Sequence, residues 1–271
     1  MKNYKQIKSK KTGPVVTIMG GIHGDEFCGY KAVEYLMQNL QQVQCGTLNL
    51  VIANQLAIKH NKREVNYNMN RIFRNDLPED IKNTYEYKRS LEIKAILDTT
   101  DILIDLHSSV EGSKPFIICE QNGLELSKCV DVRNILTNID AFHPGSTDGY
   151  MNNNAKIGIC IECGYKKDPN STRFAIESAK ALLQKLNIID TDFSIKEYQQ
   201  DVYQSDYIYT AKTDDFKLNR SFTDFDFIQA QDIVASDGAE QILFDQNYHI
   251  LFANPNAKKD QEAFLLVRKI K

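Results

Sequence analysis

Two short segments of the chain carry the side chains that zinc enzymes use as metal ligands. The segment Gly20–Glu26 (GGIHGDE) places His23 three residues before Glu26, where an apolar run ends and a helix is expected to begin. The segment Asp105–Ser109 (DLHSS) places His107 at the end of a second apolar run. Two imidazoles and one carboxylate suit a catalytic zinc that keeps one position open for water. We therefore expect one Zn²⁺ per chain on these three side chains, and hydrolytic chemistry.

A third segment supplies a carboxylate for proton transfer. Glu162 follows the apolar run Ile157–Ile161 inside the stretch Gly158–Gly164 (GICIECG). A metal-bound water has a pKa lowered toward ~7, and a carboxylate outside the ligand set can take its proton and pass it to a leaving amine. Glu162 is the candidate for this general base. Alone it is also compatible with a helix cap or a surface ion pair, but a carboxylate that ends an apolar strand usually faces a site.

The polar, loop-like stretch Asn54–Asp80 holds two arginines, Arg63 and Arg71. A tetrahedral intermediate needs a fixed cation or donor for its oxyanion, and a guanidinium binds a carboxylate through two parallel hydrogen bonds. Both arginines are candidates for these roles. For Arg71, a salt bridge that anchors the loop is an equally good reading of the local pattern.

The remaining histidines and the cysteines favour ordinary structural roles. His60, His143 and His249 lack ligand spacing. Cys160 and Cys163 are three residues apart on one expected strand, so they face opposite sides of it and do not form a second metal site. The six cysteines are scattered through a chain that is too large to need disulfides, so we expect free thiols and a cytoplasmic protein.

The elements that must position these residues alternate along the first two thirds of the chain. Apolar runs predict strands at Pro14–Met19, Thr47–Ala53, Asp101–Leu106, Pro115–Cys119 and Ile157–Ile161. Helices are expected after Asp25, which can cap the first of them, and at Tyr85–Leu97, Leu124–Ile135 and Pro169–Leu186, the last capped by Asn170 or Ser171. This pattern predicts an α/β fold with a mostly parallel central sheet flanked by helices. Ligands in such sheets bind beyond the carboxyl ends of the strands, which is where the candidate residues fall.

The pattern changes near residue 190. Short alternating segments follow at Val202–Ala211, Phe225–Ile228, Gln241–Phe244, His249–Phe252 and Phe264–Ile270, with turn signals between them. Such spacing is typical of a small all-β domain of ~80 residues, beginning near Phe193. We therefore expect two domains, an α/β domain at residues 1–190 and a β domain at 191–271.

Bulk composition excludes several classes of protein. A hydrophobic content of 42% and a charged content of 25% are ordinary for a folded globular protein, so disorder is excluded. The net charge of -3 gives no reason to expect nucleic acid or an acidic membrane as partner. The basic start of the chain is not followed by the apolar region of a signal peptide, and no apolar run is long enough for a membrane span.

Four segments together resemble the succinylglutamate desuccinylase/aspartoacylase family of the zinc carboxypeptidase-like superfamily. They are Gly20–Glu26, Asn68–Phe73 (NMNRIF), Asp105–Ser108 and Gly158–Gly164, with a weaker echo at Phe252–Phe264. The resemblance implies zinc on His23, Glu26 and His107, with Glu162 as general base. It also implies Arg63 on the oxyanion, Asn70 with Arg71 on a substrate carboxylate, and a β domain that narrows the active-site entrance.

Departures from the family pattern bear on the substrate. The family's aspartate at the start of the Asn-Arg motif is Asn68 here, and the arginine that N-acetylaspartate hydrolases carry before the base is absent from Tyr150–Asn154. Lys258 and Lys259 are the nearest counterparts of the family's substrate-closing tyrosine. We therefore expect hydrolysis of a small carboxylate-bearing N-acyl amino acid, and the departures weigh against N-acetylaspartate itself.

Two other functions remain open at this stage. One is a carboxypeptidase acting on short peptides or cell-wall fragments; the other is a metal- or ligand-binding protein without catalysis. The sequence also leaves open the acyl group, the physiological metal, for which cobalt or manganese are alternatives to zinc, and assembly into a homo-oligomer.

Overall fold

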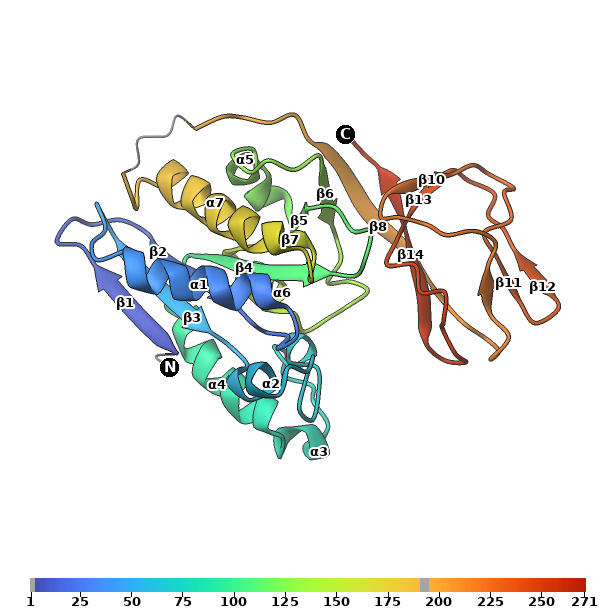
Figure 1. Cartoon of the computed structure of the whole chain (residues 1–271), viewed down its shortest axis with the longest axis horizontal. Helices are drawn as coiled ribbons and strands as arrows, with labels where there is room; N and C mark the ends of the chain where they lie inside the picture. Colours follow the sequence, from blue (N-terminus) through green and yellow to red (C-terminus); the bar gives the residue numbers. More distant parts are fainter. Residues whose placement is uncertain (1–2, 191–194) are drawn as a thin grey trace. The chain divides into compact units, whose positions relative to one another are not determined.

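The computed structural model describes residues 3–190 and 195–271, which form two compact units (Figure 1). The first unit comprises the described residues up to Ile135 together with His143–Gln200, and the second comprises Leu136–Phe142 and Asp201–Lys271. The expected start of the β domain at Phe193 lies outside the described residues. The division at residue 190 and the role of the β domain at the active-site entrance stay predictions.

A mixed sheet with a parallel centre forms the first unit. Its strands are β1 (Tyr4–Lys8), β2 (Val15–Gly20), β3 (Thr47–Ile52), β4 (Ile102–Ser109), β5 (Phe116–Cys119), the first half of β6 (Asn134–Thr137) and β7 (Ile157–Tyr165), in the order β1-β3-β2-β4-β7-β5-β6. The four central strands β3, β2, β4 and β7 are parallel, while β1 and β5 add antiparallel to β3 and β7. The predicted mostly parallel α/β sheet is confirmed. Strand β1 was not anticipated, because its sequence YKQIK contains a single aliphatic residue.

Helices cover both faces of this sheet. Helices α1 (Phe27–Asn39) and α7 (Pro169–Lys185) bury apolar residues such as Leu36 and Leu182 against one face. On the other face, Ile93 and Leu97 of α4 (Tyr85–Leu97) and Met151 of α6 (Thr147–Asn153) pack in one cluster with sheet residues. Burial of each such side chain stabilises the fold by about 1.5–3 kcal/mol. The shorter helices are α2 (Gln55–His60), η1 (Met69–Arg71), α3 (Glu79–Lys82), η2 (Gln121–Gly123) and α5 (Leu124–Ser127).

Both predicted helix caps are wrong. Helix α1 has Glu26 at its N-cap, and the Asp25 side chain instead accepts a hydrogen bond from Lys166 Nζ at 2.5 Å. Helix α7 is capped by Asp168, whose Oδ1 accepts from the backbone N–H of Asn170 at 2.8 Å. Pro169 then occupies the first turn, where its missing N–H costs nothing and its fixed φ favours the helix.

Two predicted segments also need correction. Leu124–Ile135 is not one helix, because α5 ends at Ser127 and strand β6 begins at Asn134. Some of its buried apolar residues lie on the short helix α5 and others on strand β6. Their spacing is compatible with one continuous helix, but it does not exclude this division. The stretch Asn54–Asp80 is not a continuous loop but contains α2, η1 and part of α3. Asn54 caps α2, because its Oδ1 accepts from the backbone N–H of Ala57 at 3.1 Å. The many polar residues of this stretch had made Asn54 look like a loop residue instead of a helix cap.

The second unit is built from antiparallel strands. The order β8 (Asp201–Thr210), β14 (Glu262–Lys269), β13 (Tyr248–Leu251), β10 (Asp226–Ile228) forms one set, and β12 (Glu240–Ile242), β11 (Ala235–Asp237), β9 (Lys217–Leu218) form a second sheet. Its core is aromatic, with the rings of Tyr209 and Phe264 stacked at 5.1 Å. The smaller all-β region expected from the sequence is confirmed.

None of the helices in the described ranges is long and apolar enough to cross a bilayer. The longest, α7, is amphipathic and has polar residues along one side.

Candidate metal centre and active site

The turn between β2 and α1 positions His23 and Glu26. Strand β2 ends at Gly20, where a Cβ atom would lie 2.3 Å from the backbone carbon of Gly29 in the first turn of α1. Only glycine permits this close approach of strand and helix. The approach folds the turn over the carboxyl end of β2, and both side chains then lie 4% exposed beside the neighbouring strand β4.

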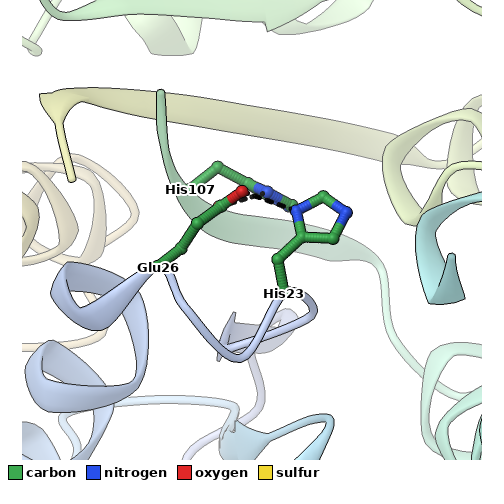
Figure 2. A group of neighbouring side chains, drawn as sticks. All are labelled: His23, Glu26 and His107. Atoms are coloured by element: carbon green, nitrogen blue, oxygen red, sulfur yellow. Dashed lines mark hydrogen bonds and ion pairs between the residues drawn. The ribbon is translucent and has the colours of Figure 1, made fainter. Parts of the chain in front are cut away.

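His23, Glu26 and His107 converge at this edge of the sheet (Figure 2). Glu26 Oε1 lies 2.7 Å from His23 Nδ1, and Glu26 Oε2 lies 3.1 Å from His107 Nδ1. The backbone N–H of Ser108 donates to Glu26 Oε2 at 3.1 Å. The two rings meet edge to face with centroids 5.2 Å apart. Residues separated by about eighty positions in the sequence are therefore brought together as expected.

Buried charge dominates the electrostatics of the three side chains. Burial alone would raise the pKa of Glu26, but the two histidines outweigh it and hold that pKa well below its ordinary value. Burial lowers the pKa of His23. Burial also opposes protonation of His107, but the carboxylates of Asp105 and Glu26 raise its pKa well above the ordinary value. The centre is thus a buried anion between two imidazoles, an environment that favours a cation.

Each histidine has a side-chain oxygen behind its outer nitrogen. His23 Nε2 lies 3.0 Å from Asn68 Oδ1, and His107 Nε2 lies 3.1 Å from Asp105 Oδ2. Both rings consequently turn Nδ1 toward Glu26. Histidines that bind metals usually have such a partner on the other nitrogen, which fixes the tautomer and the ring orientation.

The donor set fits a divalent metal ion. Ligand atoms of His23, Glu26 and His107 lie within 4.8 Å of one another, and all three side chains are buried. A second group of the same compactness contains His107, Cys160 and Glu162. Its thiol is a poorer ligand as it stands, because burial raises the pKa of Cys160 well above the ordinary value, while zinc binds thiolates. The first group is therefore the better candidate.

Glu162 lies on β7 directly beside His107, the candidate metal ligand on β4. His107 and Glu162 are register partners in the parallel β4–β7 pair, so their side chains leave the same face of the sheet. A carboxylate oxygen of Glu162 lies within 4.8 Å of a ring nitrogen of His107. The sequence placed this residue at the same edge, and the structure brings it there.

Arg63 reaches the centre from the loop that follows α2. Its Nη1 lies 3.0 Å from Glu26 Oε1, and its carbonyl oxygen accepts from Gly24 N at 3.2 Å. Half of the Arg63 side chain is exposed, so the guanidinium lies between the buried centre and solvent.

Asn70 and Arg71 lie on η1, one residue beyond Asn68. Arg71 Nη1 donates to the carbonyl oxygen of Asn70 at 2.7 Å, and a Cβ on Gly145 would lie 2.6 Å from the Arg71 carbonyl oxygen. Glycine at position 145, with φ of +92°, lets the two loops touch. Arg71 thus has a hydrogen bond within its own loop, and the loop-anchoring salt bridge stays a prediction.

Lys258 belongs to the second unit. It is exposed, its backbone N–H donates to Gln261 Oε1 at 3.0 Å, and its Nζ lies 3.4 Å from the Asp214 carbonyl oxygen. Its predicted contact with substrate stays a prediction.

Two buried polar residues at the site were not singled out as site residues from the sequence. Asp105 lies behind His107, and Thr147 Oγ1 donates to Asp105 Oδ2 at 2.5 Å. The signal for Asp105 was its position two residues before His107 on one strand, which puts both on the same face. Thr147 carried no signal, because α6 was not expected.

The model of the succinylglutamate desuccinylase/aspartoacylase catalytic domain matches residues 12–187. This is more than half of the chain and includes all four central parallel strands. The chain belongs to this family. The resemblance inferred from the sequence motifs is thereby confirmed.

Curated relatives of the chain are amidohydrolases by name. The chain is 28% identical over 167 residues to an N-acyl-aromatic-L-amino acid amidohydrolase (carboxylate-forming) of Rattus norvegicus, covering 55% of this chain and 52% of that protein. It is 28% identical over 163 residues to a probable aspartoacylase of a Nostoc species, covering 55% and 54%. The match thus spans about half the length of these relatives.

Solved structures of the family share the fold over nearly the whole chain. Succinylglutamate desuccinylase from Vibrio cholerae superposes with a TM-score of 0.82 at 18% identity, covering 99% of this chain and 86% of that one. The enzyme of the same name from Vibrio parahaemolyticus superposes with a TM-score of 0.78, also at 18% identity, with the same coverage. At this identity the likeness supports the α/β fold with its smaller β region.

Proposed function

We propose that this protein is a zinc-dependent amidohydrolase that cleaves the amide bond of a small carboxylate-bearing N-acyl amino acid. The observation that carries the proposal is the placement of Glu162 beside His107, at the edge of the buried His23–Glu26–His107 group. A ligand set of this type with an adjacent carboxylate is the arrangement of zinc hydrolases. The names of the amidohydrolase relatives support the same reaction class.

His23, Glu26 and His107 would hold the ion. Zinc bound there supplies two things, polarisation of a carbonyl oxygen and a water whose pKa is near neutrality. Glu26 contributes the negative charge, Asn68 Oδ1 pairs with the outer nitrogen of His23, and Asp105 Oδ2 lies 3.1 Å from that of His107. Burial of the group excludes bulk water, which strengthens each electrostatic interaction.

Glu162 acts as the general base in this proposal. Its carboxylate takes a proton from the attacking water and delivers it to the amine that leaves, so one residue serves as base and then as acid. Glu162 therefore ends each turnover as the carboxylate that began it.

Positive and polar groups of the 63–71 loop bind the rest of the substrate. Arg63, next to Glu26, stabilises the oxyanion, for which a fixed cation near the reacting carbon is needed. Asn70 and Arg71 bind the substrate carboxylate. The product pair is a carboxylic acid and a free amino acid.

The test is a turnover assay of zinc-loaded protein on N-acetyl, N-succinyl and N-formyl amino acids, aromatic ones included. With the best substrate, Glu162→Gln should lower kcat by about 10²–10⁴-fold while the zinc content stays at one per chain. Glu177→Gln, on the exposed side of α7, is the matched control and should leave kcat unchanged. Unchanged turnover in Glu162→Gln would remove this residue as base, and no turnover on any member of the panel would remove the proposed function.

A further inference from the structure

A continuous line of contacts joins the outer nitrogens of the two candidate metal ligands. It starts at His23 Nε2, 3.0 Å from Asn68 Oδ1, and the same Oδ1 accepts from the backbone N–H of Asn70 at 2.9 Å. Asn70 Oδ1 accepts from the backbone N–H of Thr147 at 3.2 Å. Thr147 Oγ1 donates to Asp105 Oδ2 at 2.5 Å, and that oxygen lies 3.1 Å from His107 Nε2.

Thr147 is the junction of this line. It is fully buried, and it joins two segments that are far apart in the sequence, the 68–71 loop and strand β4. Its hydroxyl serves the metal side of the site and its backbone N–H serves the substrate side. Thr147 thus contacts Asp105 through its hydroxyl and Asn70 through its backbone N–H.

The position of Thr147 is fixed by the short helix α6. Ser146 caps that helix by accepting from Gly149 N at 2.9 Å. Gly158 on β7 lets the helix lie directly on the strand, because a Cβ there would come within 2.3 Å of the Asp148 carbonyl oxygen. The hydroxyl of Thr147 is therefore delivered to Asp105 by rigid backbone rather than by a mobile loop.

We propose that Thr147 is a positioning residue that holds the Asp105 carboxylate against His107 with its hydroxyl and orients the Asn70 amide with its backbone N–H. This inference rests on the proposed zinc-dependent function. Asp105 is 0% exposed, so without the hydroxyl its Oδ2 loses a donor that aims it at the imidazole. A partner held in this way raises the basicity of a metal-binding histidine and fixes its ring.

The second contact of Thr147 sets which end of the Asn70 amide faces the substrate. Because Oδ1 accepts from Thr147 N, the oxygen of the amide is assigned to the protein side. The Nδ2 donors then face away from Thr147, where they can meet an acceptor such as a carboxylate. Substitution of the Thr147 side chain leaves this backbone contact in place, so the two roles can be separated experimentally.

The experiment measures zinc affinity of the full chain by competition with a chromogenic chelator, and kcat and KM on the best substrate. Thr147→Val, which keeps the shape but removes the hydroxyl, should weaken zinc binding about 10- to 100-fold with little change in KM. Thr147→Ser, which keeps the hydroxyl, should bind zinc within about threefold of the unmodified protein. Thr172→Val on α7 is the matched control and should behave as the unmodified protein.

A second variant keeps the proposal falsifiable if Thr147→Val fails to fold. Asp105→Asn should lose zinc affinity by a similar factor, because Thr147 acts through this carboxylate. The double variant should then lose little more than either single one. Wild-type affinity in Thr147→Val, an equal loss in Thr147→Ser, or additive losses in the double variant would each overturn the inference.

These outcomes differ from failure of the proposed function. The affinity measurement uses zinc alone, without substrate. Absence of turnover on every N-acyl amino acid, with normal zinc binding and the predicted loss in Thr147→Val, would overturn the reaction but keep the positioning role. Normal turnover of the unmodified protein, with unchanged zinc affinity in Thr147→Val, would overturn the positioning role but keep the reaction.

Discussion

Each of the two units contains a buried carboxylate whose pKa is lowered, and their surroundings differ in kind. In the first unit, Glu26 meets two imidazole nitrogens, the Arg63 guanidinium and one backbone N–H. In the second, Asp237 accepts from the Tyr209 hydroxyl at 2.9 Å, the Thr213 hydroxyl at 2.6 Å and the backbone N–H groups of Lys212 and Thr213. Burial opposes ionisation of both, and these partners outweigh it.

The difference separates a structural carboxylate from a functional one. The partners of Asp237 are neutral hydrogen-bond donors, which satisfy the carboxylate and fix the turn after β8. The main partners of Glu26 are themselves the candidate metal ligands His23 and His107, so the proposed ion can replace their protons without leaving any group unsatisfied. Low exposure and a lowered pKa are common to both sites; the chemistry of the partners distinguishes them.

The largest effect is expected from removal of a ligand. His107→Ala leaves two ligands for the metal, and zinc affinity should fall on the order of a thousandfold, with loss of turnover. Zinc content after dialysis against a weak chelator is the measurement. His60→Ala, an exposed histidine in α2, is the control and should keep one zinc per chain. Equal zinc content in both variants would contradict the assignment of Glu26 as a functional carboxylate and Asp237 as a structural one.

The next effect concerns stability without metal binding. Asp237→Ala should lower the free energy of unfolding by about 2–4 kcal/mol, because it leaves buried donors without an acceptor. Zinc content should remain at one per chain. Urea denaturation of zinc-free protein measures the change, with the exposed Asp215→Ala as control. If Asp237→Ala lost zinc instead of stability, its carboxylate would not be structural.

The contribution of Asp237 should also depend on pH. A carboxyl group whose pKa is lowered by folding stabilises the protein above its unfolded pKa of ~3.9, and that contribution is lost as pH falls through the lower folded value. The stability difference between Asp237→Ala and the unmodified protein should therefore narrow between about pH 4 and pH 2.

A third buried carboxyl, Asp148 on α6, sharpens the comparison because burial outweighs the groups that favour its ionised form. Burial, with a contribution from Asp105, raises its pKa from 3.8 to about 6. The folded state then binds the proton more tightly than the unfolded state, so ionisation destabilises the fold above pH 6 and not below pH 4. Asp148→Asn should raise the free energy of unfolding at pH 8 by about 1–3 kcal/mol, and the gain should vanish at pH 4. An equal gain at both pH values would contradict the assigned cause.

The parallel sheet, and the convergence of the candidate site residues at one of its edges, could be predicted from the sequence. Strands β2, β4 and β7 are apolar on both faces, and this pattern specifies a covered parallel sheet. Because parallel strands end at one edge, His23, Glu26, His107 and Glu162 had to approach one another there. The family resemblance added Asn70 to Arg63 and Arg71, which the polar loop had already supplied as candidates. The structure pairs Arg63 with Glu26 and Asn70 with Thr147 at this edge.

Other parts of the site could not be predicted, for physical reasons. Helix α6 has only seven residues and contains Gly149 and two consecutive asparagines, Asn152 and Asn153, which have weak helix propensity. Tertiary packing on Gly158 stabilises it instead, and this contact involves residues that are ten positions apart. Thr147 therefore had no local signal. The caps at Glu26 and Asp168 were missed because nearby polar residues competed for the same role.

Zinc-edge X-ray absorption of protein loaded with one equivalent of zinc tests the central claim most directly. The account predicts a first shell of nitrogen and oxygen atoms at about 2.0–2.2 Å with two imidazole contributions, and loss of one imidazole in His107→Ala. A sulfur neighbour at about 2.3 Å, which would place the ion on Cys160, or a shell that His107→Ala leaves unchanged, would contradict it.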